Sequence, residues 1–387
     1  MSKKPLHKVK SFLVLMFCTV VALVSGQAKA EDGAESIETG AKASVLIESN
    51  TGTVLLKENE NQAMPMASTT KVMTALLAME YDKLDEMVTV SRNAFGVPGT
   101  SIYLSQGEKI SLRHLVYGLM LASGNDAAVA IAEHIDGSVS AFCKHMTQRA
   151  RELGCEKTVF VNPNGLPAQG HQTTAYELAL IAREAMKHPE FRAIVSTQRA
   201  SIPWEGRSYD RILNNKNRLL REYEGAIGIK TGYTKAAGRC LVFGARRDGL
   251  EVIGVVLNCG DWFEEAKRIM DKGFATYEAF TAFDEGEMVR ALPVSGGQQD
   301  TVAIYAQGGL LAPVHKGRKA DLEVDLPDSL PAGMACGTIV GEARLLLGNQ
   351  IIAKAPLVVG EMVARQDYGF VLDRMLRQWV GHQSVAQ

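Results

Sequence analysis

The chain has 387 residues, of which 42 are basic and 43 acidic, and its formal net charge is −1. Because this balance contains no excess of positive charge, we expect no nucleic-acid partner. The length is sufficient for two or more domains, each with its own hydrophobic core.

The N-terminus is typical of a secretory signal peptide. A basic segment at residues 1–10 is followed by an apolar stretch at 12–24 and then by Ala28-Lys29-Ala30, an Ala-x-Ala cleavage site. The apolar stretch is too short to span a membrane comfortably. We expect cleavage after Ala30. Because residues 1–30 contain five lysines and no acidic residue, the exported chain is mildly acidic.

Residues 43–58 are predicted to form a β-hairpin, because two apolar runs flank a turn at Asn50-Thr51-Gly52. The next segment, Pro65-Met66-Ala67-Ser68-Thr69-Thr70-Lys71, leads directly into an apolar run at 72–81. That run is typical of a largely buried helix.

Ser68 and Lys71 form a Ser-x-x-Lys motif at the start of this helix. Positions i and i+3 share one face of a helix, so the hydroxyl and the amine are close enough to exchange a proton. A serine hydroxyl is a poor nucleophile until a base removes its proton. A lysine is such a base only if its pKa lies well below the usual value of about 10.4, and burial and a second cation both lower it. We therefore expect another positive charge and further polar groups around the same cleft.

Helical patterns dominate the middle of the chain, at residues 126–135, 139–153 and 174–187. Before them, an apolar run at 115–122 is predicted to form a helix that ends in a turn at Ser123-Gly124-Asn125. This turn supplies a second hydroxyl and an amide side chain.

Strand character returns near residue 227. Lys230-Thr231-Gly232 follows a short β-like run, and two longer runs at 239–245 and 251–258 flank Arg247-Asp248-Gly249, a typical hairpin turn. A helix is expected at about 262–280. Strands therefore lie at both ends of the first 280 residues, with helices between them.

This order predicts an α+β fold in which one antiparallel sheet is built from both ends and covered by helices, with a helical insertion. In such a fold the start of the Ser68 helix and the Lys230 strand face each other across a cleft. The predicted cation is thus supplied by Lys230.

A small all-β domain is predicted next, because short apolar runs at 288–365 alternate with Gly, Pro and Asp breaks. An amphipathic C-terminal helix follows, whose apolar face holds Tyr368, Val371, Leu372, Met375, Leu376, Trp379 and Val380. Such a helix either docks on the body of the protein or lies in a membrane interface. The signal peptide, without another span, favours the membrane surface.

The order Ser-x-x-Lys, Ser-x-Asn and Lys-Thr-Gly is far more specific than any one of these motifs. Serine β-lactamases and penicillin-binding proteins share it, with Ser-Asp-Asn in the middle, where this chain has Ser123-Gly124-Asn125. Further blocks at 123–127 and 162–166 and at Gly170-His171 extend the match. Nearly the whole exported chain resembles the low-molecular-mass penicillin-binding proteins that act as D-alanyl-D-alanine carboxypeptidases.

The resemblance implies removal of the terminal D-alanine from peptidoglycan stem peptides through an acyl-enzyme, and covalent inhibition by β-lactam antibiotics. It implies no metal and no organic cofactor. It also divides the chain into a signal peptide (1–30), a serine DD-peptidase catalytic domain (31–282), a small β domain (283–365) and a membrane-association helix (366–387). The protein would act at the outer face of the cytoplasmic membrane or in the cell-wall space.

Four catalytic roles follow from the resemblance. Ser68 would attack the carbonyl of the D-Ala-D-Ala bond, and Lys71 would take its proton. Ser123 would relay a proton toward the leaving amine, and Asn125 would orient Lys71 and the substrate amide.

The resemblance assigns substrate binding to Lys230, Thr231, Gly232 and Tyr233. Lys230 and Thr231 would bind the terminal carboxylate of the substrate. The backbone N–H groups of Ser68 and Tyr233 would form the oxyanion hole.

The chain departs from the family at three places. Relatives carry an arginine after the last of these strands to bind the terminal carboxylate, but residues 258–263 contain none. Many relatives have Asp at the position of Ile227, and many also have Asp at the position of Glu177. Carboxylate recognition is therefore expected to rest on Lys230, Thr231 and Thr234. We interpret His171 and Glu177 as structural residues.

Three other functions stay open. A DD-endopeptidase would cut cross-links with the same residues, and a serine β-lactamase would hydrolyse its acyl-enzyme quickly. A wall-binding or penicillin-sensing protein would keep the fold without the chemistry. The β domain and the C-terminal helix favour the peptidase over the lactamase, and the complete motif set argues against a non-catalytic protein.

Five cysteines remain after cleavage, an odd number that cannot form a complete set of disulfides. We expect them to be small buried side chains. A Cys143–Cys155 pair is left open, and the cysteine spacing suggests no metal site.

Overall fold

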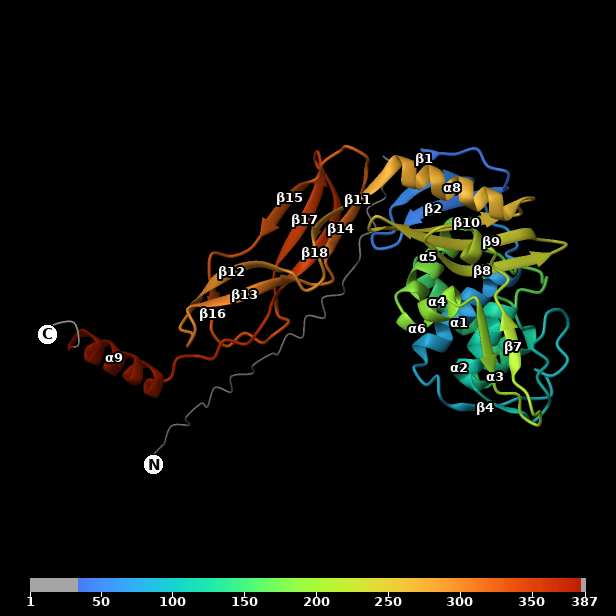
Figure 1. Ribbon diagram of the computed structural model, residues 1–387, viewed down its shortest axis with the longest axis horizontal. Helices are drawn as coiled ribbons and strands as arrows, with labels where there is room; N and C mark the ends of the chain where they lie inside the picture. The colour runs from blue at the N-terminus through green and yellow to red at the C-terminus, as the bar shows by residue number, and fades with distance from the viewer. Residues whose placement is uncertain (1–33, 384–387) are drawn as a thin grey trace, which may run out of the picture.

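The computed structural model describes residues 34–383, so the predicted signal peptide lies outside the described residues. Its main sheet has six strands in the order β1-β3-β2-β10-β9-β8. These strands are β1 (Glu35–Ser36), β2 (Ala43–Glu48), β3 (Val54–Glu58), β8 (Ala226–Thr234), β9 (Gly238–Arg247) and β10 (Leu250–Leu257). β2 and β10 pair antiparallel at the centre, with Glu48 opposite Val252. The prediction that one sheet is built from both ends of the first 280 residues is confirmed (Figure 1).

The predicted turn between β9 and β10 also forms. Asp248 and Gly249 have φ values of 48° and 82°. Two consecutive positive φ values are characteristic of the type I′ turn, whose twist matches that of antiparallel strands. This turn sets the register of the hairpin that carries β8 at the edge of the sheet.

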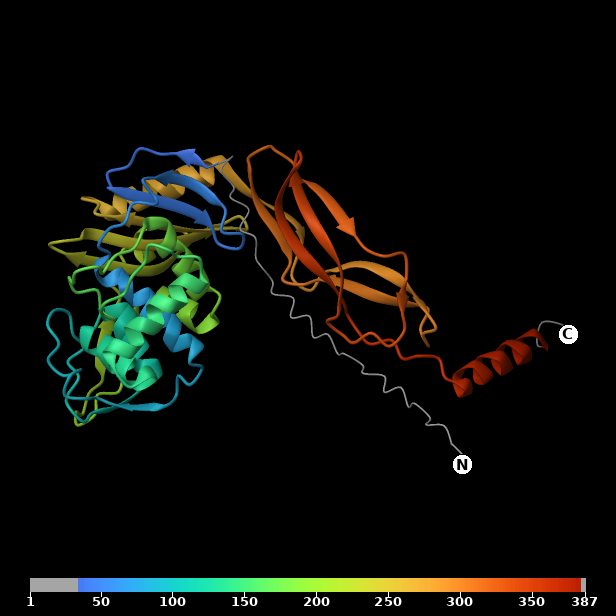
Figure 2. The same ribbon diagram turned by 180° about the vertical axis from the view of Figure 1, so that it is seen from behind.

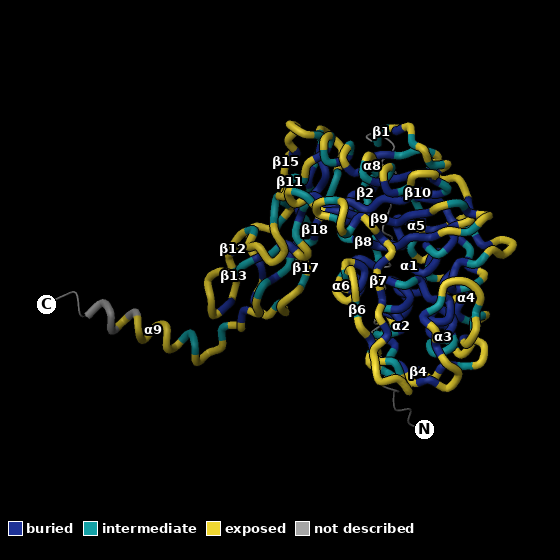
Figure 3. The backbone as a smooth tube through the Cα atoms, turned by 45° about the vertical axis from the view of Figure 1, so that its right-hand side comes forward, coloured by how far each residue is buried: buried dark blue, intermediate teal, exposed yellow. Residues whose placement is uncertain are grey.

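A helical region covers one face of the sheet (Figures 1 and 3). It comprises α1 (Lys71–Glu80), α2 (Leu112–Tyr117), α3 (Asn125–Asp136), α4 (Val139–Glu152), α5 (Ala175–Met186) and α6 (Pro189–Ser196). Smaller elements complete it: η1 (Ala67–Thr70), η2 (Gly118–Ala122), α7 (Leu219–Glu222), and two hairpins, β4 (Met87–Thr89) with β5 (Lys109–Ser111) and β6 (Arg199–Ile202) with β7 (Arg211–Asn214). The predicted helices of the middle region are confirmed.

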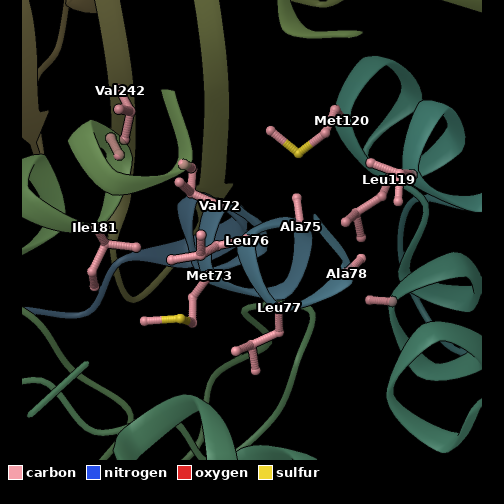
Figure 4. Packing of buried hydrophobic residues seen from close by; sticks show 14 of the residues in the cluster. Val72, Met73, Ala75, Leu76, Leu77, Ala78, Leu119, Met120, Ile181 and Val242 are labelled. Atoms are coloured by element: carbon pink, nitrogen blue, oxygen red, sulfur yellow. The ribbon is translucent and has the colours of Figure 1, made fainter. Parts of the chain in front are cut away.

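Helix α1 lies at the centre of this region. Every residue from Lys71 to Met79 is buried. Figure 4 shows Val72, Leu76 and Leu77 among side chains from the surrounding helices and from the sheet. A helix that is apolar on all sides is held in place by neighbours on all sides, so the residues at its start have a fixed position.

Helix α8 (Trp262–Thr276) covers the opposite face of the sheet, where Phe263 and Ala266 pack against Leu241 and Phe243. The sequence predicted a helix that continues to about residue 280, but the helix ends at Thr276. From Tyr277 the chain is extended, because β11 (Tyr277–Phe283) pairs with β14 (Leu310–His315) of the next domain. Residues 277–282, which the sequence analysis assigned to the catalytic domain, are thus part of a strand that pairs with the next domain.

The predicted small all-β domain is present. A six-stranded sheet contains β12 (Met288–Ser295), β13 (Thr301–Ala306), β15 (Asp321–Asp325), β16 (Leu330–Pro331), β17 (Ile339–Leu347) and β18 (Gln350–Val359). Together with the β11–β14 pair it encloses a separate core that includes Ile304, Leu345 and Leu357. Figure 2 shows this domain beside the larger one.

The predicted C-terminal helix is α9 (Tyr368–Gln383), which extends away from the β domain (Figures 1 and 2). Its apolar residues are largely uncovered: Leu372, Met375, Leu376 and Trp379 are all exposed. They do not dock on the body of the protein. Among residues 34–383, no helix combines the length and the hydropathy that crossing a membrane requires.

Candidate active site

Ser68 lies in the 3₁₀ turn η1 that leads into α1. The residue before it, Ala67, has a φ of 49°, a conformation that L-residues with a Cβ rarely adopt. The turn places Ser68, which is half-buried, at the start of a buried helix. Ser68 Oγ is 3.0 Å from Lys71 Nζ.

Three oxygens surround the amine of Lys71. Besides Ser68 Oγ, the Oδ1 atom of Asn125 lies at 2.7 Å and the carbonyl oxygen of Asn164 at 2.5 Å. The last two oxygens only accept hydrogen bonds. A neutral amine has two N–H donors for them and one lone pair, which is then free to accept the proton of the Ser68 hydroxyl.

The electrostatics of the site favour this neutral form. Lys71 is fully buried, and burial is the largest cause that holds its pKa well below the ordinary value. The positive charges of Lys230 and Lys216 lower the pKa further, while the carboxylate of Asp126 raises it. The surroundings of Lys71 thus favour the neutral amine that a base at this position requires.

Lys230 lies on the edge strand β8 and is 1% exposed. Its ammonium group donates a hydrogen bond of 2.8 Å to the carbonyl oxygen of Thr231. Burial, and then the charge of Lys216, lower its pKa to about 7. The predicted cation is therefore only partly protonated at neutral pH in the free protein.

Lys216 is a cation of the site that the sequence reasoning missed. It is an exposed residue of the loop between β7 and α7, and its backbone N–H donates to the carbonyl oxygen of Leu121, two residues before Ser123. Loss of hydration on the side of the amine that lies against the protein lowers its own pKa. No motif distinguishes it, because its role depends on where this loop lies in the fold.

The Ser123 motif lies at a break between helices. The π-helical turn η2 ends at Ala122, and the next residue, Ser123, has a φ of 64° and is 4% exposed. Asn125 then begins α3, and its Nδ2 group donates 2.6 Å to the carbonyl oxygen of Pro98. Because this bond fixes the amide, Asn125 Oδ1 points to Lys71 as the sequence analysis expected.

The block at residues 162–166 holds the third oxygen around Lys71. The side chain of Asn162 accepts from the N–H of Gly165 at 2.7 Å and donates to the carbonyl oxygen of Leu166 at 2.8 Å. This closed loop presents the carbonyl of Asn164 to the amine. A Cβ on Gly165 would lie 1.9 Å from the carbonyl oxygen of Ala67. The loop and the nucleophile segment are thus in direct backbone contact.

The strand β8 closes the site from the other side. A Cβ on Gly232 would lie 2.8 Å from Ser68 N and 2.9 Å from Thr69 N. Glycine is therefore required here so that the strand can approach the backbone of Ser68 and Thr69. Thr231 is buried, whereas the side chain of Tyr233 is 62% exposed.

His171 and Glu177 serve the surrounding structure, as interpreted from the sequence. The Nδ1 atom of His171 accepts from Val161 N at 3.0 Å, so its Nε2–H donates to Thr70 Oγ1 at 2.8 Å. Burial lowers the pKa of His171 to about 4, which keeps the ring neutral. Glu177 accepts from Lys157 N and Thr158 Oγ1 at 2.9 and 2.6 Å.

The five cysteines of the described residues are free, so the Cys143–Cys155 pair is not formed in the structure. Four are buried and Cys336 is exposed. Within residues 34–383, no group of His, Cys, Asp and Glu side chains is arranged to hold a metal ion.

Comparison with known proteins places this site in a family. The model of the peptidase family S11, D-alanyl-D-alanine carboxypeptidase, matches residues 28–260. The chain belongs to this family. The model of the penicillin-binding protein 5 C-terminal domain matches residues 277–365.

Individual members of the S11 family match over most of the chain. D-alanyl-D-alanine carboxypeptidase DacF of Bacillus subtilis is 32% identical over 362 residues, covering 90% of this chain and 93% of that protein. DacC of Escherichia coli is 30% identical and covers 91% and 92%. The crystal structure of penicillin-binding protein 5 from Haemophilus influenzae superposes with a TM-score of 0.68 at 28% identity, covering 86% of this chain and all of that one.

Replacement of Gly232 by alanine tests the close approach of β8 to the nucleophile. The added Cβ forces the strand and the Ser68 backbone apart, and a misplacement of about 1 Å at a reacting centre costs roughly 100-fold in rate. We therefore expect Gly232→Ala to lower the second-order rate of acylation by a fluorescent penicillin by about 100-fold, in a protein that is still folded but melts at a lower temperature.

Gly40→Ala is the matched control, because a Cβ there would meet only Glu265 Oε2, at an ordinary contact distance of 3.4 Å. It should acylate at the wild-type rate. A Gly232→Ala variant that acylates as fast as Gly40→Ala would contradict the steric argument.

Proposed function

We propose that Ser68 is the nucleophile of a serine D-Ala-D-Ala carboxypeptidase that removes the terminal D-alanine from peptidoglycan stem peptides. The observation that carries the assignment is the buried amine of Lys71, which lies 3.0 Å from Ser68 Oγ and has acceptor oxygens on its other sides. Membership of the S11 family supports the activity and the binding of penicillin.

In the proposed acylation step, Lys71 takes the proton of the Ser68 hydroxyl as Ser68 Oγ attacks the carbonyl carbon between the two D-alanines. The resulting oxyanion accepts hydrogen bonds from the backbone N–H groups of Ser68 and Tyr233. One such donor is typically worth roughly 3–4 kcal/mol in the transition state. The approach of Gly232 to Ser68 N supports this pairing of donors.

Collapse of the intermediate requires a proton on the leaving amine. Lys71 holds that proton, and we assign its transfer to the amine to the hydroxyl of Ser123, which precedes Asn125 by two residues. The C–N bond breaks, free D-alanine leaves, and the acyl group stays on Ser68 as an ester. Water then attacks the ester, with Lys71 again as the base, and regenerates the hydroxyl.

Lys230 and Thr231 are proposed to bind the terminal carboxylate. A carboxylate beside Lys230 favours the protonated form of a lysine whose pKa in the free protein is about 7. Substrate binding thus raises the protonated fraction of Lys230, which burial lowers in the free protein. Lys216, whose charge lowers the pKa of Lys230, lies on a segment that borders the same site.

A cell-wall peptidase meets its substrate outside the cytoplasm, and the N-terminal sequence is typical of an exported protein. We propose the outer face of the cytoplasmic membrane or the cell-wall space as its location, with residues 31–282 as the catalytic unit and 283–365 as a separate domain. The exposed apolar residues of α9 support its proposed role at a membrane surface.

Replacement of Ser68 by alanine tests the nucleophile. We expect Ser68→Ala to lose covalent labelling by fluorescent penicillin and release of D-alanine from a stem pentapeptide, at an unchanged melting temperature. Ser123→Ala, which retains the nucleophile, should be slowed without losing labelling at long times. Wild-type labelling of Ser68→Ala would disprove the assignment.

The same assay separates the related activities. Wild-type protein given a pentapeptide and a cross-linked muropeptide should release D-alanine from the first and leave the second intact, with a long-lived penicillin adduct. Preferential cleavage of the cross-linked dimer would indicate an endopeptidase, and rapid turnover of penicillin a β-lactamase.

The pH dependence tests Lys230. As the pH rises through about 7, Lys230 loses its proton, so carboxylate binding weakens and kcat/KM for a D-Ala-D-Ala peptide should fall. Arginine stays charged at every pH of the assay. In Lys230→Arg the alkaline decline should disappear, although the absolute rate is lower because the guanidinium has a different shape.

The exposed Lys235, on the same hairpin, provides the matched control. Lys235→Arg should keep the wild-type profile. If Lys230→Arg shows the same alkaline decline as the wild type, another group controls it.

Removal of residues 368–387 tests the membrane role. The truncated mature protein should no longer sediment with vesicles that contain phosphatidylglycerol, because the apolar residues of α9 are gone, while its penicillin labelling stays unchanged. Leu376→Asp with Trp379→Asp should reproduce the loss, and Asp373→Ser, on the polar face, should not. Sedimentation of the truncated form at the wild-type level would contradict the proposal.

A further inference from the structure

A hollow of about 520 Å³ lies beside the substrate-binding strand. Its lining comes from the end of the β8–β9 hairpin and from the segment after β10: Tyr233, Gly238, Arg239, Asn258, Cys259 and Gly260. This volume is in the range of small-molecule sites. Tyr233 belongs both to this hollow and to the proposed oxyanion hole, so the two sites are contiguous.

Arg239 supplies the positive charge of the hollow. It pairs with Tyr233 across the two strands, and cross-strand partners project their side chains to the same face of a sheet. One corner of its guanidinium, Nη1, donates 2.6 Å to the carbonyl oxygen of Gly260. Among residues 34–383 no carboxylate forms an ion pair with it, not even Asp261, which follows Gly260 in the chain. The remaining N–H groups are free for a planar anion such as a carboxylate.

The proposed catalytic roles fix the direction of the substrate along β8. The terminal carboxylate lies at Lys230 and Thr231, and the scissile carbonyl lies at the N–H of Tyr233. An extended peptide and a strand both advance by about 3.3 Å per residue. The acyl side of the substrate therefore continues past Tyr233 toward Thr234 and Gly238, where the hairpin ends and the hollow begins.

We propose that this hollow binds a side-chain carboxylate on the acyl side of the scissile bond, so that Arg239 selects stem peptides whose third residue carries such a group. The inference rests on the proposed function, because it uses the substrate orientation set by Ser68, Thr231 and Tyr233. It assigns a role in specificity to a cation on β9. The arginine that relatives carry after the last of these strands is absent from this chain.

Two synthetic peptides provide the test. Both are acetyl-L-2-aminopimelyl-D-Ala-D-Ala, one with a free side-chain carboxylate and the other with its carboxamide, so they differ only in the charge of that group. Because charge-assisted hydrogen bonds are about twice as strong as neutral ones, we expect the wild-type protein to favour the carboxylate peptide by about tenfold in kcat/KM. The preference should lie mainly in KM.

In Arg239→Gln the ratio of the two kcat/KM values should fall to about one, through loss on the carboxylate peptide alone. Arg246→Gln is the matched control, because Arg246 is an exposed arginine at the other end of β9. It should keep the wild-type ratio. Penicillin acylation should be the same in all three proteins, which shows that the catalytic centre is intact.

Two results would overturn the inference and leave the proposed function standing. An unchanged ratio in Arg239→Gln means that the hollow does not bind the side-chain carboxylate of the peptide. An equal loss on both peptides means that Arg239 binds the terminal carboxylate, which the two share. Absence of D-alanine release from both peptides by the wild-type protein would instead overturn the proposed function, and the inference with it.

Discussion

The site is organised around one buried amine. Lys71 has no contact with solvent, and an ammonium group in such a position loses several kcal/mol of hydration even after the protein relaxes. Its two acceptor-only neighbours, Asn125 Oδ1 and the carbonyl of Asn164, satisfy the two N–H groups of a neutral amine and leave its lone pair toward Ser68. Burial thus produces a base, and the neighbouring cations make protonation still less favourable.

A second layer of contacts keeps these oxygens in place. Asn162 closes the loop that presents the carbonyl of Asn164, and Thr74 Oγ1 donates to the carbonyl oxygen of the residue between them. His171 holds the nucleophile segment through Thr70, whose hydroxyl also donates to the carbonyl oxygen of Ala67. These groups do not touch the substrate in the proposed mechanism, but each one fixes an atom that does.

The sequence was informative where chemistry requires a particular side chain. Ser68, Lys71, Asn125 and Lys230 were found from motifs, and the structure brings them around one site as expected. The sheet was predictable because its strands have β-like composition and a clear turn at Asp248. Because strands lie at both ends of the domain and helices lie between them, few folds were compatible with this order.

The missed features depend on position instead of residue type. The carbonyl of Asn164 is a backbone group, so no side-chain pattern announces it. Lys216 and Arg239 are ordinary basic residues until the fold brings them beside Lys230 and Tyr233. The end of α8 at Thr276 was missed because the strand that continues from it is paired with β14, more than 30 residues later in the chain.

The main sheet combines strands from the two ends of the catalytic domain, and this has a consequence for folding during synthesis. The buried hydrogen bond from Ser49 Oγ to Glu251 Oε1 joins residues 202 positions apart, and β2 has no partner on its β10 side until that late segment is available. Contacts between such distant segments are slow to form. During synthesis, Ser68 emerges from the ribosome long before Lys230, so an incomplete chain carries the Ser-x-x-Lys motif without the rest of its site. Acyl-transfer chemistry therefore begins only after almost the whole catalytic domain has been synthesised and has folded.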